Sequence, residues 1–85
     1  MTITHAATEP RWLSPVFVRI GYGLPEAIRT PRDAMTYLHF RWPAKRGRAF
    51  DEARMQCASA VEANRACESA REAFIRASVE AGILD

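Results

Sequence analysis

The sequence has no apolar run of about 18 residues, the length that a membrane-spanning helix requires. It also lacks a basic N-terminal start followed by an apolar block, which is the pattern of a secretory signal peptide. We therefore expect a cytoplasmic protein that has no membrane partner.

Metal-ligating and redox-active residues are scarce. The two cysteines, Cys57 and Cys67, lie in alanine-rich helical sequence and form no Cys-x-x-Cys pair, and the two histidines, His5 and His39, are isolated. A zinc site needs a cluster of such ligands at characteristic spacings. We predict no metal and no cofactor. We interpret the cysteines as buried thiols that pack as small apolar groups, with a redox role as the alternative.

Signatures of catalysis are also missing. The sequence shows no nucleophile beside a base and no paired carboxylates. Gly21 and Gly23 lack the third glycine and the helix start of a phosphate-binding loop. A pair of Cys57 and His39 in the folded chain is the one conceivable nucleophile and base, and two isolated residues are weak evidence for it. We expect a protein that is not an enzyme.

What the sequence does contain is the composition of a small folded domain. Its 85 residues are 48% hydrophobic and 26% charged, which is ordinary for a single globular domain. The net charge of +2 is too small to indicate a partner, but residues 1–48 hold eight Lys/Arg against three Asp/Glu, and residues 49–85 hold four against seven. This asymmetry fits an anionic partner, pairing of two copies, or solvated faces without a partner.

The first part of the domain has the pattern of a β-hairpin. Residues 1–11 show no hydrophobic periodicity and are expected to form a disordered tail, which leaves residues 12–85 as a single domain. Apolar residues alternate over 16–20, and a glycine-containing turn over 21–25 leads into a second short strand over 26–29. A two-stranded hairpin is marginal alone, so helices or strands of a second copy must cover it.

A first helix follows the hairpin. Thr30, Pro31 and Asp33 are the residue types preferred at the N-cap, the first position and the first turn of a helix. Pro43 ends this helix after about ten residues, because proline excludes the preceding residue from a helical conformation.

Residues 48–81 have helical composition but contain two apolar stripes that do not share one helix face. Continuing the first stripe would place Asn64 and Arg71 in the core. Because Asn tolerates the left-handed conformation that ends helices, we predict a break near Asn64 and a turn around 63–66. The stripes comprise Phe50, Ala53, Cys57, Ala60 and Val61, and then Cys67, Ala70, Phe74, Ala77 and Ala81.

The last helix should therefore have one buried and one solvated side. A polar ladder predicts the solvated side, and Gly82 followed by Ile83 predicts the stop. The predicted fold class is α+β, a short antiparallel hairpin followed by three helices (ββααα) in one compact domain. The ladder consists of Glu68, Glu72, Arg76 and Glu80.

Candidate ligand-binding residues gather in a basic loop between the first two helices. The cations would contact nucleic-acid phosphates, and the indole would stack on a base. The alternative is structural, with Trp42 plugging the core beside Pro43 and Arg46 capping carbonyls of the first helix. The candidates are Arg41, Trp42, Lys45, Arg46 and Arg48.

The order of these features resembles one family. Trp42-Pro43-x-x-Arg46-Gly47 and Ala70-Arg71-Glu72-Ala73-Phe74-Ile75 are distinctive in combination, and Thr30-Pro31-x-x-Ala34 precedes them. Over about residues 14–84 the chain is similar to the small bacterial family catalogued as domain of unknown function 982. Ala63-Asn64 departs from the glycine expected at the turn. The resemblance implies no activity and no site residues.

Association with a protein partner, or with a second copy as a homodimer, is the leading functional hypothesis. A short hairpin with an exposed edge and helices rich in small residues favour it. The alternative is a weak nucleic-acid-binding or regulatory protein that uses the basic loop around residues 42–47.

Overall fold

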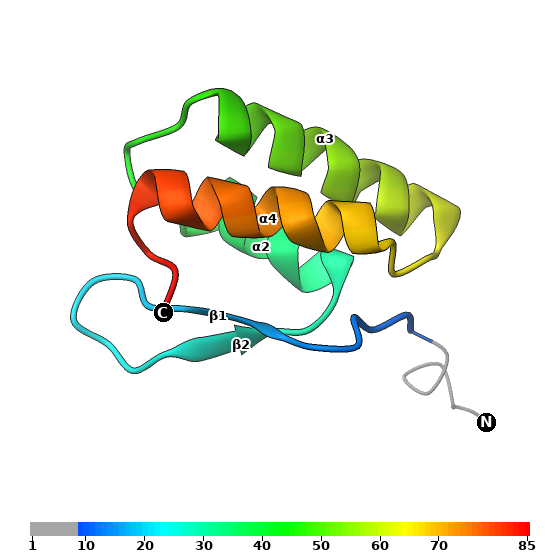
Figure 1. Cartoon of the computed structure of the whole chain (residues 1–85), viewed down its shortest axis with the longest axis horizontal. Coiled ribbons are helices and arrows are strands. Elements are labelled where there is room, and N and C mark those ends of the chain that lie inside the picture. Colours follow the sequence, from blue (N-terminus) through cyan, green and yellow to red (C-terminus); the bar gives the residue numbers. More distant parts are fainter. Residues whose placement is uncertain (1–8) are drawn as a thin grey trace.

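The computed structural model describes residues 9–85 and contains a hairpin followed by three helices (Figure 1). The predicted α+β class and the ββααα order are confirmed, in a single compact domain. Residues 1–8 of the predicted tail lie outside the described residues. The elements are β1 (Val16–Val18), β2 (Glu26–Ile28), α2 (Pro31–Phe40), α3 (Arg48–Ala63) and α4 (Glu68–Ala81).

The hairpin buries one face and exposes the other, as its alternating sequence predicts. β1 and β2 are antiparallel, with Val16 opposite Ile28 and Val18 opposite Glu26. Val16, Val18 and Ile28 are buried, whereas Phe17 points away from the core and is 46% exposed. Successive side chains of a strand alternate between its two faces, so the helices cover only one face of the sheet.

The edges of the hairpin have fewer backbone groups free to pair with a partner strand than the sequence predicts. The C-terminal residues pair with the outer edge of β1, where the N–H of Arg19 donates to the carbonyl of Ile83 at 2.8 Å and that of Asp85 donates to Phe17 at 2.9 Å. The outer edge of β2 is three residues long and follows Pro25. Short edges next to proline disfavour strand addition, so the hairpin edge is a poor docking site.

The ends of the helices follow local sequence signals. The Thr30 hydroxyl accepts the N–H of Asp33 at 3.0 Å and caps α2, whose first residue is Pro31. α3 ends where Asn64 adopts φ 57°, and α4 ends where Gly82 adopts φ 74°. The predicted break near Asn64 and the predicted stop at Gly82 are both confirmed.

Cys67 departs from the prediction. It was expected on the buried stripe of the last helix, but α4 begins at Glu68 and Cys67 is the residue before it, with φ 56° and a half-buried side chain. The turn between α3 and α4 thus contains a second residue with positive φ, Cys67, which precedes the first residue of α4.

The three helices pack together on one side of the hairpin (Figure 1). α3 and α4 run antiparallel and form the most extensive contact, and α2 packs against α3. Alanines at the interface let the two long helices approach closely, and Phe74 of α4 is completely buried at the centre of the core. No helix in the described part of the chain combines the length and apolarity needed to span a membrane. The buried alanines of α3 and α4 are Ala53, Ala60, Ala70, Ala73 and Ala77.

Candidate functional site

The first cation of the basic loop, Arg41, is held by an acidic partner. Its Nη1 and Nη2 donate to the two carboxylate oxygens of Glu26 at 2.7 and 2.9 Å, and its guanidinium lies 4.7 Å from the ring centroid of Tyr37. The Tyr37 hydroxyl also donates to Glu26. Hydrogen bonds from Arg41 and then from Tyr37 lower the pKa of Glu26 to about 2. Arg41 therefore fastens α2 to β2.

Trp42 is a core residue. Its indole is 6% exposed and packs against Phe50 and Phe74, with ring centroids 6.1 and 5.6 Å apart. A base cannot stack on a buried ring, so the nucleic-acid role considered for Trp42 does not fit this conformation. The indole N–H has no acceptor within hydrogen-bond distance among the described residues.

Arg46 folds back over its own loop. Its guanidinium lies 5.2 Å from the ring centroid of Phe50, and its Nε and Nη2 point at the carbonyls of Pro43 and Trp42 at 3.4 Å. These carbonyls follow the end of α2, so Arg46 stabilises the loop, close to the structural role predicted for it. Lys45 and Arg48 are exposed and take part in no ion pair within the described residues.

A carboxylate of the last helix also contacts the loop, although the sequence pattern predicted that this side chain would be solvated. Glu80 was expected on the solvated side of the last helix, but it is half-buried and accepts the N–H groups of Gly47, Ala49 and Phe50 at 3.0, 3.3 and 3.3 Å. Burial raises the pKa of Glu80, but these donors and the charge of Lys45 outweigh it and leave the pKa below its usual value. Glu80 thus caps α3 and offsets positive charge in the loop.

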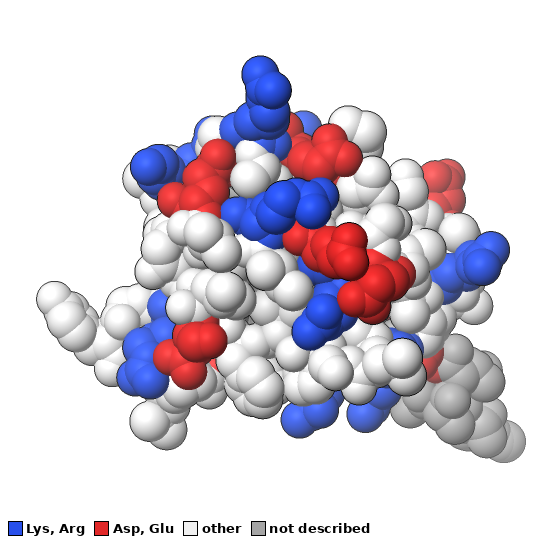
Figure 2. Space-filling view, in the orientation of Figure 1, with Lys and Arg blue, Asp and Glu red and all other residues white. Residues whose placement is uncertain are grey.

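The face of the molecule that carries α4 has a mixed surface charge. Positive and negative side chains are interspersed there, without a large area of one sign (Figure 2). Nucleic-acid binding draws its affinity from several cations gathered on one surface. The face that carries α4 shows no such cluster of cations (Figure 2).

The cysteine and histidine considered as a catalytic pair lie on different helices and differ in exposure. Cys57 is completely buried between α3 and α4, with its Sγ 3.8 Å from the carbonyl oxygen of Ala70, and burial raises its pKa to about 12. His39 is exposed on α2 and lines a surface groove. No group of three His, Cys, Asp or Glu residues suited to a metal ion occurs within residues 9–85.

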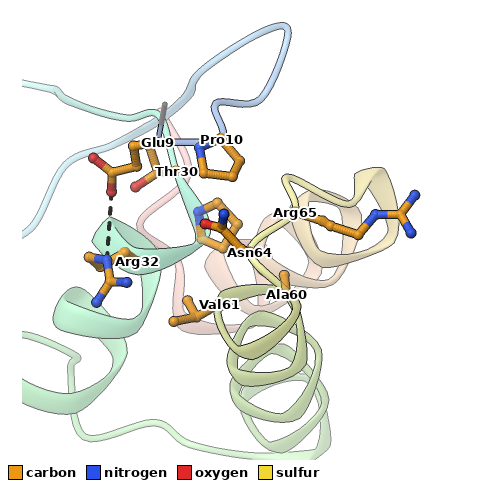
Figure 3. A pocket seen from close by; sticks show the side chains of 9 residues that line it. Glu9, Pro10, Thr30, Arg32, Ala60, Val61, Asn64 and Arg65 are labelled. Carbon is orange, nitrogen blue, oxygen red and sulfur yellow. Dashed lines mark ion pairs between the residues drawn. The ribbon is translucent and has the colours of Figure 1, made fainter. Parts of the chain in front are cut away.

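A small pocket lies where the described chain begins (Figure 3). Its cavity volume is about 20 Å³, far below the size of ligand sites. Glu9 and Arg32 form an ion pair of 3.7 Å at its rim, Asn64 and Val61 form its other wall, and Arg65 points away from it (Figure 3). The pocket holds no cluster of convergent polar groups, and we assign it no ligand.

A wider open feature is a groove between the outer faces of α2 and α3, which we call the α2–α3 groove. Met35 and His39 line it from α2, and Met55, Ala58 and Glu62 line it from α3. The side chain of Met55 is 60% exposed. At one end of the groove, Phe40 is 82% exposed. The groove was not predicted from the sequence, although Met55, an apolar residue off the first apolar stripe, was a signal of it.

A family model described as "Protein of unknown function (DUF982)" matches residues 14–85. No curated protein and no solved structure matches the chain significantly.

Proposed function

The chain belongs to the DUF982 family, as its sequence motifs predicted, and we propose that it is a protein-interaction module without enzymatic activity of its own. The observation that carries this proposal is the α2–α3 groove, in which apolar side chains remain open to solvent although the domain has a complete core elsewhere. Large exposed apolar groups that share one concave surface mark interaction sites.

The chemistry of the groove suits a helical partner. Its walls are two helices, and Met35 of α2 and Ala58 of α3 are among its lining residues. Methionine side chains are flexible and adapt to different apolar partners, and an amphipathic helix fits such a groove with its apolar face. Charged residues at the rim, Arg54 and Glu62 among them, would set the orientation of the partner.

The basic loop is less suited to ligand binding than the α2–α3 groove. Arg41 is paired with Glu26, Trp42 is buried, and Arg46 lies on Phe50. All four cations are exposed, but Arg41 and Arg46 are engaged within the chain, which leaves Lys45 and Arg48 without such a contact among the described residues, and Glu80 offsets part of the charge. Nucleic-acid binding through this loop would rest on few phosphate contacts.

A pair of matched substitutions tests the proposal. Met55→Glu places a charge in the groove, and Val79→Glu places one on the outer face of α4, at a side chain that is also 60% exposed. In quantitative capture from the native cell extract, proteins retained by the wild type should be retained by Val79→Glu and lost by Met55→Glu. Equal retention by both variants would contradict the proposal. Circular dichroism checks that both variants are folded.

A further inference from the structure

The outer face of α3 carries a stripe of exposed residues whose charges can pair with those of the same stripe on a second copy. Its residues are spaced three and four apart, and all are exposed. This spacing places them on one side of a helix, opposite the side that Phe50, Ala53 and Cys57 bury. The stripe consists of Asp51, Arg54, Met55, Ala58, Ser59 and Glu62.

The charges of the stripe select one arrangement of two such helices. If two copies of α3 run antiparallel about a two-fold axis at Ala58, residues equally far from Ala58 face each other. Arg54 of each copy then faces Glu62 of the other, and two opposite-charge contacts form at once. A parallel arrangement would bring Arg54 next to Arg54. An antiparallel register centred between residues 56 and 57 would bring Asp51 opposite Glu62, and like charges repel.

The side chains between the charges suit close contact. Ala58 at the axis has a small side chain, which lets two helix axes approach to about 8 Å. Met55 lies three residues from the axis and faces the level of Val61 of the other copy, next to the groove wall formed by Met35. The second helix therefore lies along the α2–α3 groove and covers its exposed methionine.

The charged members of the stripe are available for this contact. The ion pairs among the described residues join Arg19 to Asp85, Arg32 to Glu9, Arg41 to Glu26 and Arg71 to Glu68. None of them uses Asp51, Arg54 or Glu62. On the outer face of α4, by contrast, Arg71 is already held by Glu68 and by the carbonyl of Ser14.

We propose that the occupant of the groove is a second copy of this chain, docked through an antiparallel α3–α3 contact centred on Ala58. This inference rests on the proposed function and names the partner. The contact is isologous, so it closes on itself as a dimer and does not propagate into a filament.

Charge reversal with complementation tests the pairing. The wild type should have twice the 9.6 kDa mass of one chain in light scattering at micromolar concentration. Arg54→Glu alone and Glu62→Arg alone should each weaken the dimer at least about tenfold, because each turns two attractive contacts into repulsive ones. An equimolar mixture of the two variants should regain the dimer mass, since both contacts are then attractive. Recovery in the mixture also shows that each variant is folded.

Three results would overturn the inference: a wild-type mass of one chain at micromolar concentration, single reversals that leave the dimer intact, or a mixture that stays monomeric. The proposed function fails separately. A monomeric wild type whose protein capture still depends on Met55 would leave the interaction module standing and remove the second copy as its partner. A dimer with the predicted complementation, but with capture independent of Met55, would support the second copy as a partner and contradict the interaction module.

Discussion

The carboxylate of Glu80, near the end of α4, accepts the backbone N–H of Gly47 at 3.0 Å, immediately before α3 begins. The first N–H groups of a helix have no partner within it, and an acidic side chain both satisfies them and interacts favourably with the helix dipole. A Cβ atom at position 47 would lie 2.5 Å from Oε2 of Glu80. The glycine therefore makes the contact sterically possible, and the contact ties the basic loop to the last helix.

Gly47→Ala should displace Glu80 and destabilise the fold. Gly47 has φ −101°, outside the left-handed region, so the added methyl group destabilises the folded chain through its clash with the carboxylate. We expect the free energy of unfolding to fall by about 1 kcal/mol, the usual effect of losing a helix cap. Urea denaturation measures the change.

Gly23→Ala is the matched control for this substitution. A Cβ there would meet only the carbonyl oxygen of Ile20, at an ordinary contact distance of 3.8 Å. Stability should be unchanged or slightly increased, because alanine restricts the unfolded chain. Equal destabilisation by both substitutions would show that the Glu80 contact does not matter.

Glu26 should make stability depend on acid pH. Its pKa of about 2 in the folded chain is below the usual value of 4.5, mainly because Arg41 and Tyr37 donate hydrogen bonds to it. The carboxylate thus contributes stability that is fully present above its unfolded pKa and is lost as the pH falls toward 2. The slope of the unfolding free energy against pH reports how many protons are taken up on unfolding. Glu26→Gln should reduce that uptake in this window by up to one proton.

The control for this pH dependence is Glu72→Gln. Glu72 is exposed on α4 and makes no hydrogen bond or ion pair within the described residues. Its variant removes one exposed carboxylate and leaves the contacts of Glu26 in place, so urea denaturation between pH 2 and 4.5 should still show the slope contributed by Glu26. If Glu26→Gln also kept that slope, the contacts from Arg41 and Tyr37 would not persist in solution.

The two tryptophans provide an internal comparison. Trp12 and Trp42 are equally buried and both pack against Phe74, but only the indole N–H of Trp12 has an acceptor, the carbonyl of Ala66 at 2.7 Å. Trp12→Phe should therefore lower the free energy of unfolding by about 1 kcal/mol more than Trp42→Phe, which removes a buried donor that has no partner. Equal losses in thermal denaturation would contradict this difference.

The features predicted correctly from the sequence are those encoded by neighbouring residues. Thr30 and Pro31 specify the start of α2 through their own backbone preferences, and Asn64 and Gly82 end helices because they adopt positive φ at low cost. The break at Asn64 was also required by the phase of two apolar stripes. These signals need no knowledge of the tertiary structure.

The features that were missed depend on residues far apart in the chain. Glu80 fits a solvated polar ladder by its spacing, and only the packing of α4 against the start of α3 brings it to Gly47. The cover on β1 comes from Asp85 and its neighbours, which no local pattern relates to Phe17. The groove likewise arises from the angle at which α2 crosses α3, a property of the packed core.

Backbone amide chemical shifts distinguish the α2–α3 groove from the basic loop as the binding surface. We would record them for the labelled protein on dilution and then during titration with a single-stranded oligonucleotide. Dilution should shift amides around Met35, His39 and residues 51–62, and the oligonucleotide should leave residues 41–48 unchanged. Saturable, salt-sensitive shifts at Lys45, Arg46 and Arg48, with a groove that does not respond to dilution, would contradict the assignment of the groove.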